Sequence, residues 1–165
     1  LQFMRFTRNW LRDRGLPPYE ISNYAAPGEE CRHNLVYWES GNYLGLGPAA
    51  ASNLAGFRWR NAPNLKRYLD AVLSDQRVPV ADVETLDANQ RATELVMLML
   101  RLTKGLGWRR MREISQLDGA QLMRAAVKRL SAMGLLVETA DGIRLTDEGC
   151  YVADEVISEL VREVS

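Results

Sequence analysis

Apolar residues recur every three or four positions at the start of the chain, with charged residues between them. Phe3, Phe6 and Trp10 form this series, which predicts an amphipathic helix that Gly15 and the two prolines after it bring to an end. Residues 19–24 then alternate with the period of two that is typical of a strand. The chain is therefore predicted to open with a helix and a strand.

The next segments continue this alternation. Residues 31–39 predict a short helix, residues 43–48 a glycine-rich buried strand and residues 57–60 a short exposed strand. Pro63 stands where a helix begins, and apolar residues follow it at helical spacing. The order helix, strand, helix, strand, helix is typical of a parallel α/β unit, so residues 1–78 are predicted to form an α/β domain.

A different pattern occupies the second half of the chain. Residues 79–88 are predicted to be a linker, and Asp87 with Gln90 predicts a capping box at the start of a buried helix. Further helical segments follow, then a hairpin across residues 141–142, and Thr146 is predicted to cap a last helix. This order predicts a small winged-helix-like α-helical domain over residues 89–165.

Charge and hydropathy limit the classes of partner. Lys plus Arg and Asp plus Glu number 21 each, so no overall field attracts nucleic acid or an anionic membrane. The most apolar run, residues 95–100, is too short to span a membrane. Two widely separated cysteines suit a reducing compartment, and we expect a cytoplasmic protein. Because the chain opens inside a predicted helix, we expect it to be a fragment of a longer protein.

The densest candidate chemistry lies in the predicted helix at 31–39. His33 is the only histidine in the chain, and a neutral imidazole can ligate iron. Helical spacing puts Asn34, Tyr37 and Trp38 on one face, with His33 beside Tyr37, so the aromatic rings are positioned to stack on a flat macrocycle. A partly buried histidine beside ordinary core aromatics is the alternative. Cys31 and His33 are too few to form a zinc site.

Two other segments are candidates for contact with a cofactor. Glu20 and Ser22 share one face of the predicted strand, and polar side chains at strand ends in α/β barrels usually face a ligand. The small residues Gly45, Gly47 and Ala49 let another group approach the backbone closely. An edge strand and tight contact between strands are the respective alternatives. The glycines do not form a dinucleotide-binding fingerprint, because the third glycine is missing.

Several of these segments, taken together, resemble the HemW family of heme chaperones, which is closely related to the oxygen-independent coproporphyrinogen III oxidases. The resemblance is carried by Tyr-Glu-Ile-Ser-Asn-Tyr-Ala at 19–25, Cys-Arg-His-Asn at 31–34, Tyr-Trp at 37–38 and Tyr-Leu-Gly-Leu-Gly at 43–47. Weaker matches to the family's small C-terminal domain follow, at residues 101–106, 134–136 and 144–149.

The resemblance implies a radical S-adenosylmethionine protein whose [4Fe-4S] cluster is bound by a C-x-x-x-C-x-x-C motif. That motif does not occur here, so the chain is expected to be the C-terminal section of a partial (β/α) barrel followed by the winged-helix-like domain, with no catalytic residue of its own. His33 takes the heme-binding role, and the segment at 45–47 lines the barrel near the cofactor. Ala51 departs from the family, which often has histidine at that position.

The resemblance leaves three functions open. The first is a heme chaperone that binds heme or a porphyrin and passes it to an acceptor protein, completed by an N-terminal half outside this chain. The second is radical decarboxylation of coproporphyrinogen by the whole protein. The third is a nucleic-acid-binding winged helix that uses Arg124, Lys128 and Arg129, which the net acidic second half disfavours.

Overall fold

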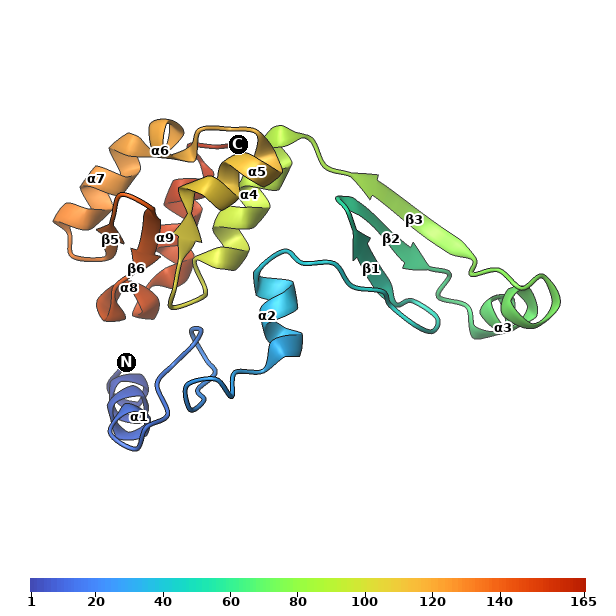
Figure 1. The fold of residues 1–165 in the computed structure, drawn as a ribbon, viewed down its shortest axis with the longest axis horizontal. Coiled ribbons are helices and arrows are strands. Elements are labelled where there is room, and N and C mark those ends of the chain that lie inside the picture. Colours follow the sequence, from blue (N-terminus) through green and yellow to red (C-terminus); the bar gives the residue numbers. More distant parts are fainter. The chain divides into compact units, whose positions relative to one another are not determined.

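A computed structural model describes all residues, 1–165 (Figure 1). The chain divides into two compact units, which are described separately. The large unit combines residues 1–40 with residues 87–165, and the small unit consists of residues 41–86. None of the helices combines the length and the apolar character that a membrane-spanning segment requires.

The small unit is built on an antiparallel sheet in the order β1-β2-β3, whose strands span Ala51–Leu54, Phe57–Asn61 and Val80–Thr85. Ala55 and Gly56 connect β1 to β2, and both have positive φ, as a two-residue hairpin turn of type I′ requires. Helix α3, Leu65–Ser74, lies between β2 and β3, and the Asn64 side chain caps it by accepting from the Arg67 amide.

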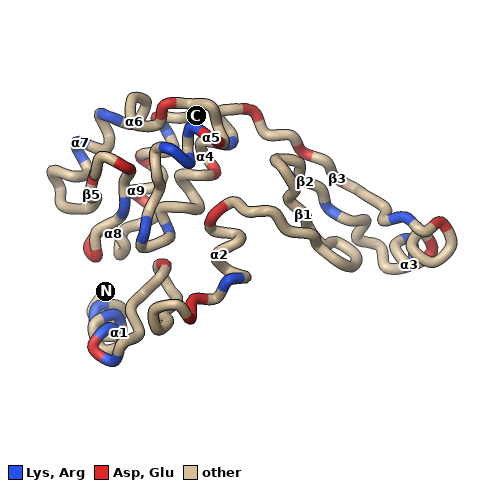
Figure 2. The backbone as a smooth tube through the Cα atoms, in the orientation of Figure 1, with Lys and Arg blue, Asp and Glu red and all other residues tan.

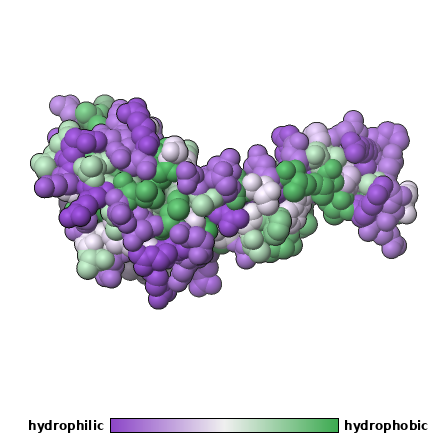
Figure 3. Space-filling model, turned by 90° about the horizontal axis from the view of Figure 1, so that it is seen from above, coloured by the Kyte–Doolittle hydropathy of each residue, from purple (hydrophilic) through white to green (hydrophobic).

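The register of this sheet places Leu54, Phe57, Trp59 and Val83 on one face, because directly paired residues of antiparallel strands point the same way. Leu54, Phe57 and Val83 are exposed, and Figure 3 shows apolar residues reaching the surface of the small unit. The small unit therefore buries few apolar side chains of its own.

The large unit contains the hydrophobic core. Its second part runs through α4 (Ala88–Met99), β4 (Leu106–Gly107), α5 (Trp108–Ser115), α6 (Gly119–Leu122), α7 (Arg124–Ala132), the hairpin of β5 (Leu136–Glu138) and β6 (Gly142–Leu145), α8 (Asp147–Tyr151) and α9 (Ala153–Val161). Side chains from these helices and strands form one continuous cluster, including Leu95, Met111, Leu130, Ile143 and Leu160. The predicted capping box of Asp87 and Gln90, the hairpin and the Thr146 cap are all confirmed.

Helix α1, Gln2–Arg12, has the predicted position but an unexpected orientation. Arg8 is its only buried residue, whereas Phe3 and Phe6 are 85% and 64% exposed. Arg8 donates to the Asp147 carboxylate at 3.0 Å, and Arg12 pairs with the same carboxylate at 2.9 Å. Figure 2 shows the basic residues grouped along α1. The arginine side of this helix, and not its aromatic side, therefore faces the rest of the large unit.

The mixed α/β class is confirmed, but the expected parallel strands are wrong. Every strand pair is antiparallel. For β1 and β2 this follows from the two-residue turn that joins them, since a parallel pair needs a long crossover. Residues 19–24 and 43–48 make only isolated bridges. Strand β3 lies inside the predicted linker at 79–88, while the division at residues 78 and 89 stays a proposal about the domains of the whole protein.

Candidate functional site

Helix α2, Arg32–Trp38, carries the candidate heme-binding residues and belongs to the large unit. Cys31 is its N-cap in an extended conformation and makes no side-chain cap bond. The last helical residue is Trp38, and Glu39 is the C-cap, two residues before Gly41. Its residues therefore divide between a face that points to solvent and a face that contacts the rest of the unit.

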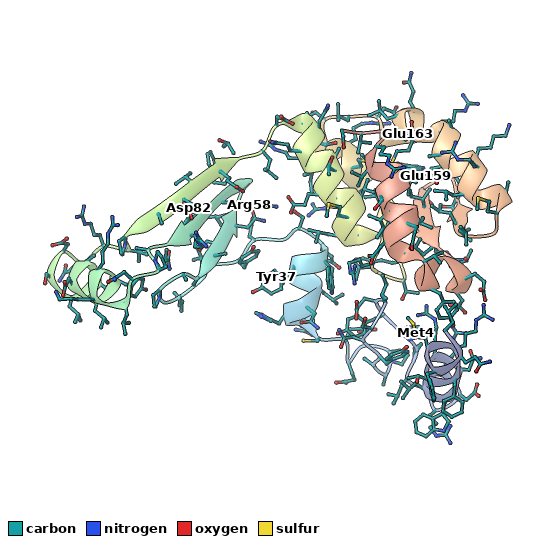
Figure 4. The ribbon with its side chains drawn as sticks, turned by 180° about the vertical axis from the view of Figure 1, so that it is seen from behind. Met4, Tyr37, Arg58, Asp82, Glu159 and Glu163 are labelled. Carbon is teal, nitrogen blue, oxygen red and sulfur yellow. The ribbon has the colours of Figure 1, made fainter.

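His33 and Tyr37 lie on the solvent face, one helical turn apart. Both are exposed, and their ring centroids are 4.9 Å apart with planes at 89°, an edge-to-face contact. Figure 4 shows the Tyr37 side chain projecting from the helix. The imidazole of His33 is therefore open to a ligand from outside the chain, with an aromatic ring against one side of it.

Asn34 and Trp38 lie on an adjoining face, where both are half-buried. The Asn34 amide donates to the Tyr19 hydroxyl at 3.4 Å, and the Arg101 guanidinium lies 5.2 Å from the centre of the Trp38 ring. The structure thus sets Asn34 and Trp38 against neighbouring side chains and leaves Tyr37 exposed, and a role of these three residues toward heme stays a prediction. The four residues form two pairs at i and i+4: His33 and Tyr37 are exposed, whereas Asn34 and Trp38 are half-buried.

Glu20 and Ser22 form a local turn. Glu20 is 2% exposed, and its carboxylate accepts from the Ser22 amide at 2.8 Å. Residue Glu20 also forms an isolated bridge with Leu102. The carboxylate therefore already has a backbone partner, and a role of either residue toward a cofactor stays a prediction.

In the small unit, side chains fix the glycine segment from several sides. The Asn61 amide donates to the carbonyl oxygens of Gly45 and Gly47, at 3.1 and 2.9 Å. The Gly45 amide donates to Ser52 Oγ at 3.0 Å, and the Gly47 amide to the Tyr68 hydroxyl at 3.2 Å. These four backbone groups are thus satisfied within the chain, so the glycines present no free backbone donor to a ligand.

The need for glycine at position 45 is steric. A Cβ there would lie 2.2 Å from the Ala51 carbonyl oxygen, which is backbone and cannot move aside easily. Ala49 and Ala51 are exposed, and Ala49 has a φ of 60°. Close contact between backbone segments, the alternative considered from sequence, therefore accounts for Gly45; the assignment of Gly45, Gly47 and Ala49 to a cofactor stays a prediction.

The two thiols have different surroundings. Cys31 is exposed, whereas Cys150 is half-buried and lies 3.7 Å from Arg8 Nη2. Burial raises the pKa of the Cys150 thiol, although the Arg8 charge opposes the shift. No group of three or more His, Cys, Asp and Glu side chains is arranged to hold a metal ion. An iron–sulfur cluster therefore has no set of ligands in this chain.

Comparisons with known families and proteins all find similarity to HemW, HemN or related radical S-adenosyl methionine proteins. Residues 86–152 match the HemN C-terminal domain. The heme chaperone HemW of Mycobacterium tuberculosis is 37% identical over 92% of this chain and 36% of its own length. HemW of Bacillus subtilis is 32% identical over 93% and 40%, and the bovine mitochondrial radical S-adenosyl methionine domain-containing protein 1 is 30% identical over 92% and 36%.

A solved structure supports the fold. The coproporphyrinogen III oxidase HemN of Escherichia coli, described as a radical SAM enzyme, matches 98% of this chain with a TM-score of 0.64 at 18% identity. The match covers 39% of the HemN chain. This chain therefore spans well under half the length of the relatives that it matches.

Proposed function

Because this chain belongs to the family of HemW and HemN-like proteins and corresponds to its C-terminal part, we propose that it is the C-terminal portion of a heme chaperone. It binds heme through His33 and passes it to an acceptor protein. The whole protein works in the cytoplasm and carries a [4Fe-4S] cluster and S-adenosylmethionine on a part outside this chain.

One observation carries the assignment of the site: the only histidine of the chain is exposed on α2. The residue type fits heme, since an accessible imidazole nitrogen is a common axial ligand of its iron. Tyr37, whose ring edge contacts the imidazole, limits the orientations that the ring can take. The open setting suits a protein that must release its cargo to another protein.

The oxidase alternative has weaker support. Relatives at 32–37% identity are named heme chaperones, whereas the HemN oxidase is related at 18%. Nucleic-acid binding is also disfavoured, because Arg129 on α7 pairs with Glu159 at 2.6 Å and so does not offer a free charge to phosphate.

The direct test is a hemin titration of the full-length protein and its His33→Ala variant, followed by the Soret band. We expect His33→Ala to lose the wild-type Soret position and to bind hemin at least tenfold more weakly, because it removes the iron ligand. Cys31→Ser is the matched control, since a thiol is also a possible iron ligand and Cys31 is exposed at this end of α2.

The control separates the two ligands. If Cys31→Ser keeps the wild-type spectrum while His33→Ala loses it, the imidazole is the ligand. An unchanged Soret band in His33→Ala, or loss of the band in Cys31→Ser alone, overturns the assignment of His33.

A further inference from the structure

Helix α2 has few means of stabilising itself. It has seven residues, no side-chain bond at its N-cap, no acidic residue in its first turn and no basic residue in its last turn. Isolated helices shorter than about 12 residues are marginal in water, and the dipole of this one is not compensated by its own charges. The conformation that presents His33 must therefore be held by contacts from elsewhere in the large unit.

Besides the bond from Asn34 to Tyr19, these contacts come from the segment that matches the HemN C-terminal domain, and several of them meet the C-terminal end of the helix. Arg110 Nη2 donates to the Glu39 carbonyl oxygen at 3.1 Å, where a helix leaves carbonyls without partners. Lys104 Nζ pairs with the Glu39 carboxylate at 2.5 Å. Ser40 Oγ adds a bond to the Glu94 carboxylate at 3.4 Å.

Both cations act on an unfavourable arrangement of charge. The C-terminal end of a helix carries partial negative charge, and Glu39 adds a full negative charge at that end. Arg110 supplies the missing cation and a donor for a free carbonyl, and Lys104 neutralises the Glu39 side chain. Arg110 is half-buried, so its bond is less exposed to competing water than a bond at the surface.

We propose that Arg110 and Lys104 are positioning residues for His33, so that the C-terminal domain keeps the heme-binding helix folded. This proposal rests on the proposed function of His33. When α2 frays, the His33–Tyr37 pair separates and the competent fraction of the protein falls. The apparent Kd for heme rises in inverse proportion to that fraction.

The test compares Arg110→Gln with Arg109→Gln in the full-length protein. Both substitutions remove one arginine from α5, but Arg109 has a 92% exposed side chain and pairs only with Glu113 on its own helix. We expect Arg110→Gln to raise the Kd for hemin about five- to tenfold and to broaden the ferric heme EPR signal, with Tm within about 2 °C of wild type. Arg109→Gln is expected to match wild type in all three measurements.

A charge exchange gives a second, independent measurement. Lys104→Glu is expected to weaken hemin binding, and Glu39→Lys combined with Lys104→Glu to restore it, because the pair is re-formed with opposite polarity. Failure of this restoration overturns the role of Lys104. A Kd for Arg110→Gln within twofold of that for Arg109→Gln overturns the role of Arg110.

The His33→Ala variant shows whether a negative result contradicts only the positioning role or the proposed heme site itself. If His33→Ala abolishes the Soret signature while Arg110→Gln behaves like Arg109→Gln, heme binding at His33 stands and the positioning role is wrong. If His33→Ala leaves the signature intact, the proposed site itself fails.

Discussion

Asn61 uses one side-chain amide to hold two glycine carbonyls and is only 1% exposed. The sequence identified Gly45 and Gly47 as positions of close approach, and the structure shows which groups approach them. It could not identify Asn61, because asparagine in a short polar strand reads as a surface residue. His33 was proposed from sequence because its type is unique in the chain and chemically specific, and its role toward heme stays a prediction.

Asn61→Ala is expected to lower the free energy of unfolding by about 2–3 kcal/mol, because two partly buried carbonyls lose their donor. Asn61→Asp is expected to cost more, since it sets a carboxylate oxygen against those carbonyls. Urea denaturation measures both variants. The control is Asn23→Ala, at an exposed position, with an expected change within about 0.5 kcal/mol; equal effects of Asn61→Ala and Asn23→Ala would contradict the role of the amide.

At the scale of elements, α1 shows that hydrophobic periodicity predicts a helix but not which side of the helix is buried. Its periodicity predicts a helix, and the helix is present. Which side turns inward depends on the surface that it meets, and here that surface offers Asp147 and Glu148 at the start of α8. A charged helix face can be the buried one when carboxylates lie opposite it. The spacing of residues in α1 carries no information about the carboxylates that α8 presents to it.

The pairing of α1 with α8 gives a pH-dependent stability. Burial by itself would raise the pKa of Asp147, but the hydrogen bond from Arg12 and the charges of Arg8 and Arg12 outweigh it and hold the pKa below its ordinary 3.8. A carboxyl group with a lowered pKa stabilises the fold above its unfolded-state pKa, and this contribution is lost as the pH falls through the folded-state value.

Asp147→Asn is therefore expected to lower the stability at pH 7 by roughly 1–2 kcal/mol, a value reduced by the partial exposure of the carboxylate. The difference from wild type is expected to shrink as the pH falls from about 3.8 through the lower folded-state pKa of Asp147, where the folded wild-type carboxyl also takes up a proton. Denaturant titrations of both proteins at pH 7 and pH 3 measure this difference in the free energy of unfolding. Asp82→Asn, whose partner Arg60 is largely exposed, serves as control with an expected change within about 0.5 kcal/mol.

At the scale of the whole chain, helix positions and caps were predictable because local spacing and capping chemistry determine them. The contacts between segments were not. The β1–β2 turn is Ala-Gly, which lacks the usual Asn-Gly or Asp-Gly signal, so the hairpin was missed and a parallel arrangement was expected. The union of residues 1–40 with 87–165 depends on contacts distant in sequence, such as Arg8 with Asp147.

The two units are expected to differ in local stability. In the small unit the buried residues are small or polar, namely Ser52, Asn53, Asn61, Ala62 and Ala71, whereas the large unit buries the hydrophobic cluster. Backbone amides of β1, β2 and β3 are therefore expected to exchange hydrogen for deuterium faster than those of α4 and α9. Mass spectrometry of peptic fragments measures this, and equal protection of the two units would contradict it.

The unequal setting of the two thiols has a practical consequence. Cys31 is exposed and stands two residues before His33, while Cys150 is half-buried with a raised pKa, so a maleimide dye reacts first at Cys31. If heme binds at His33 as proposed, a dye at Cys31 is expected to lose emission when heme binds and to recover it when heme is released. Labelling of the exposed Cys31 thiol therefore provides a fluorescence signal with which heme binding and transfer to an acceptor protein can be timed.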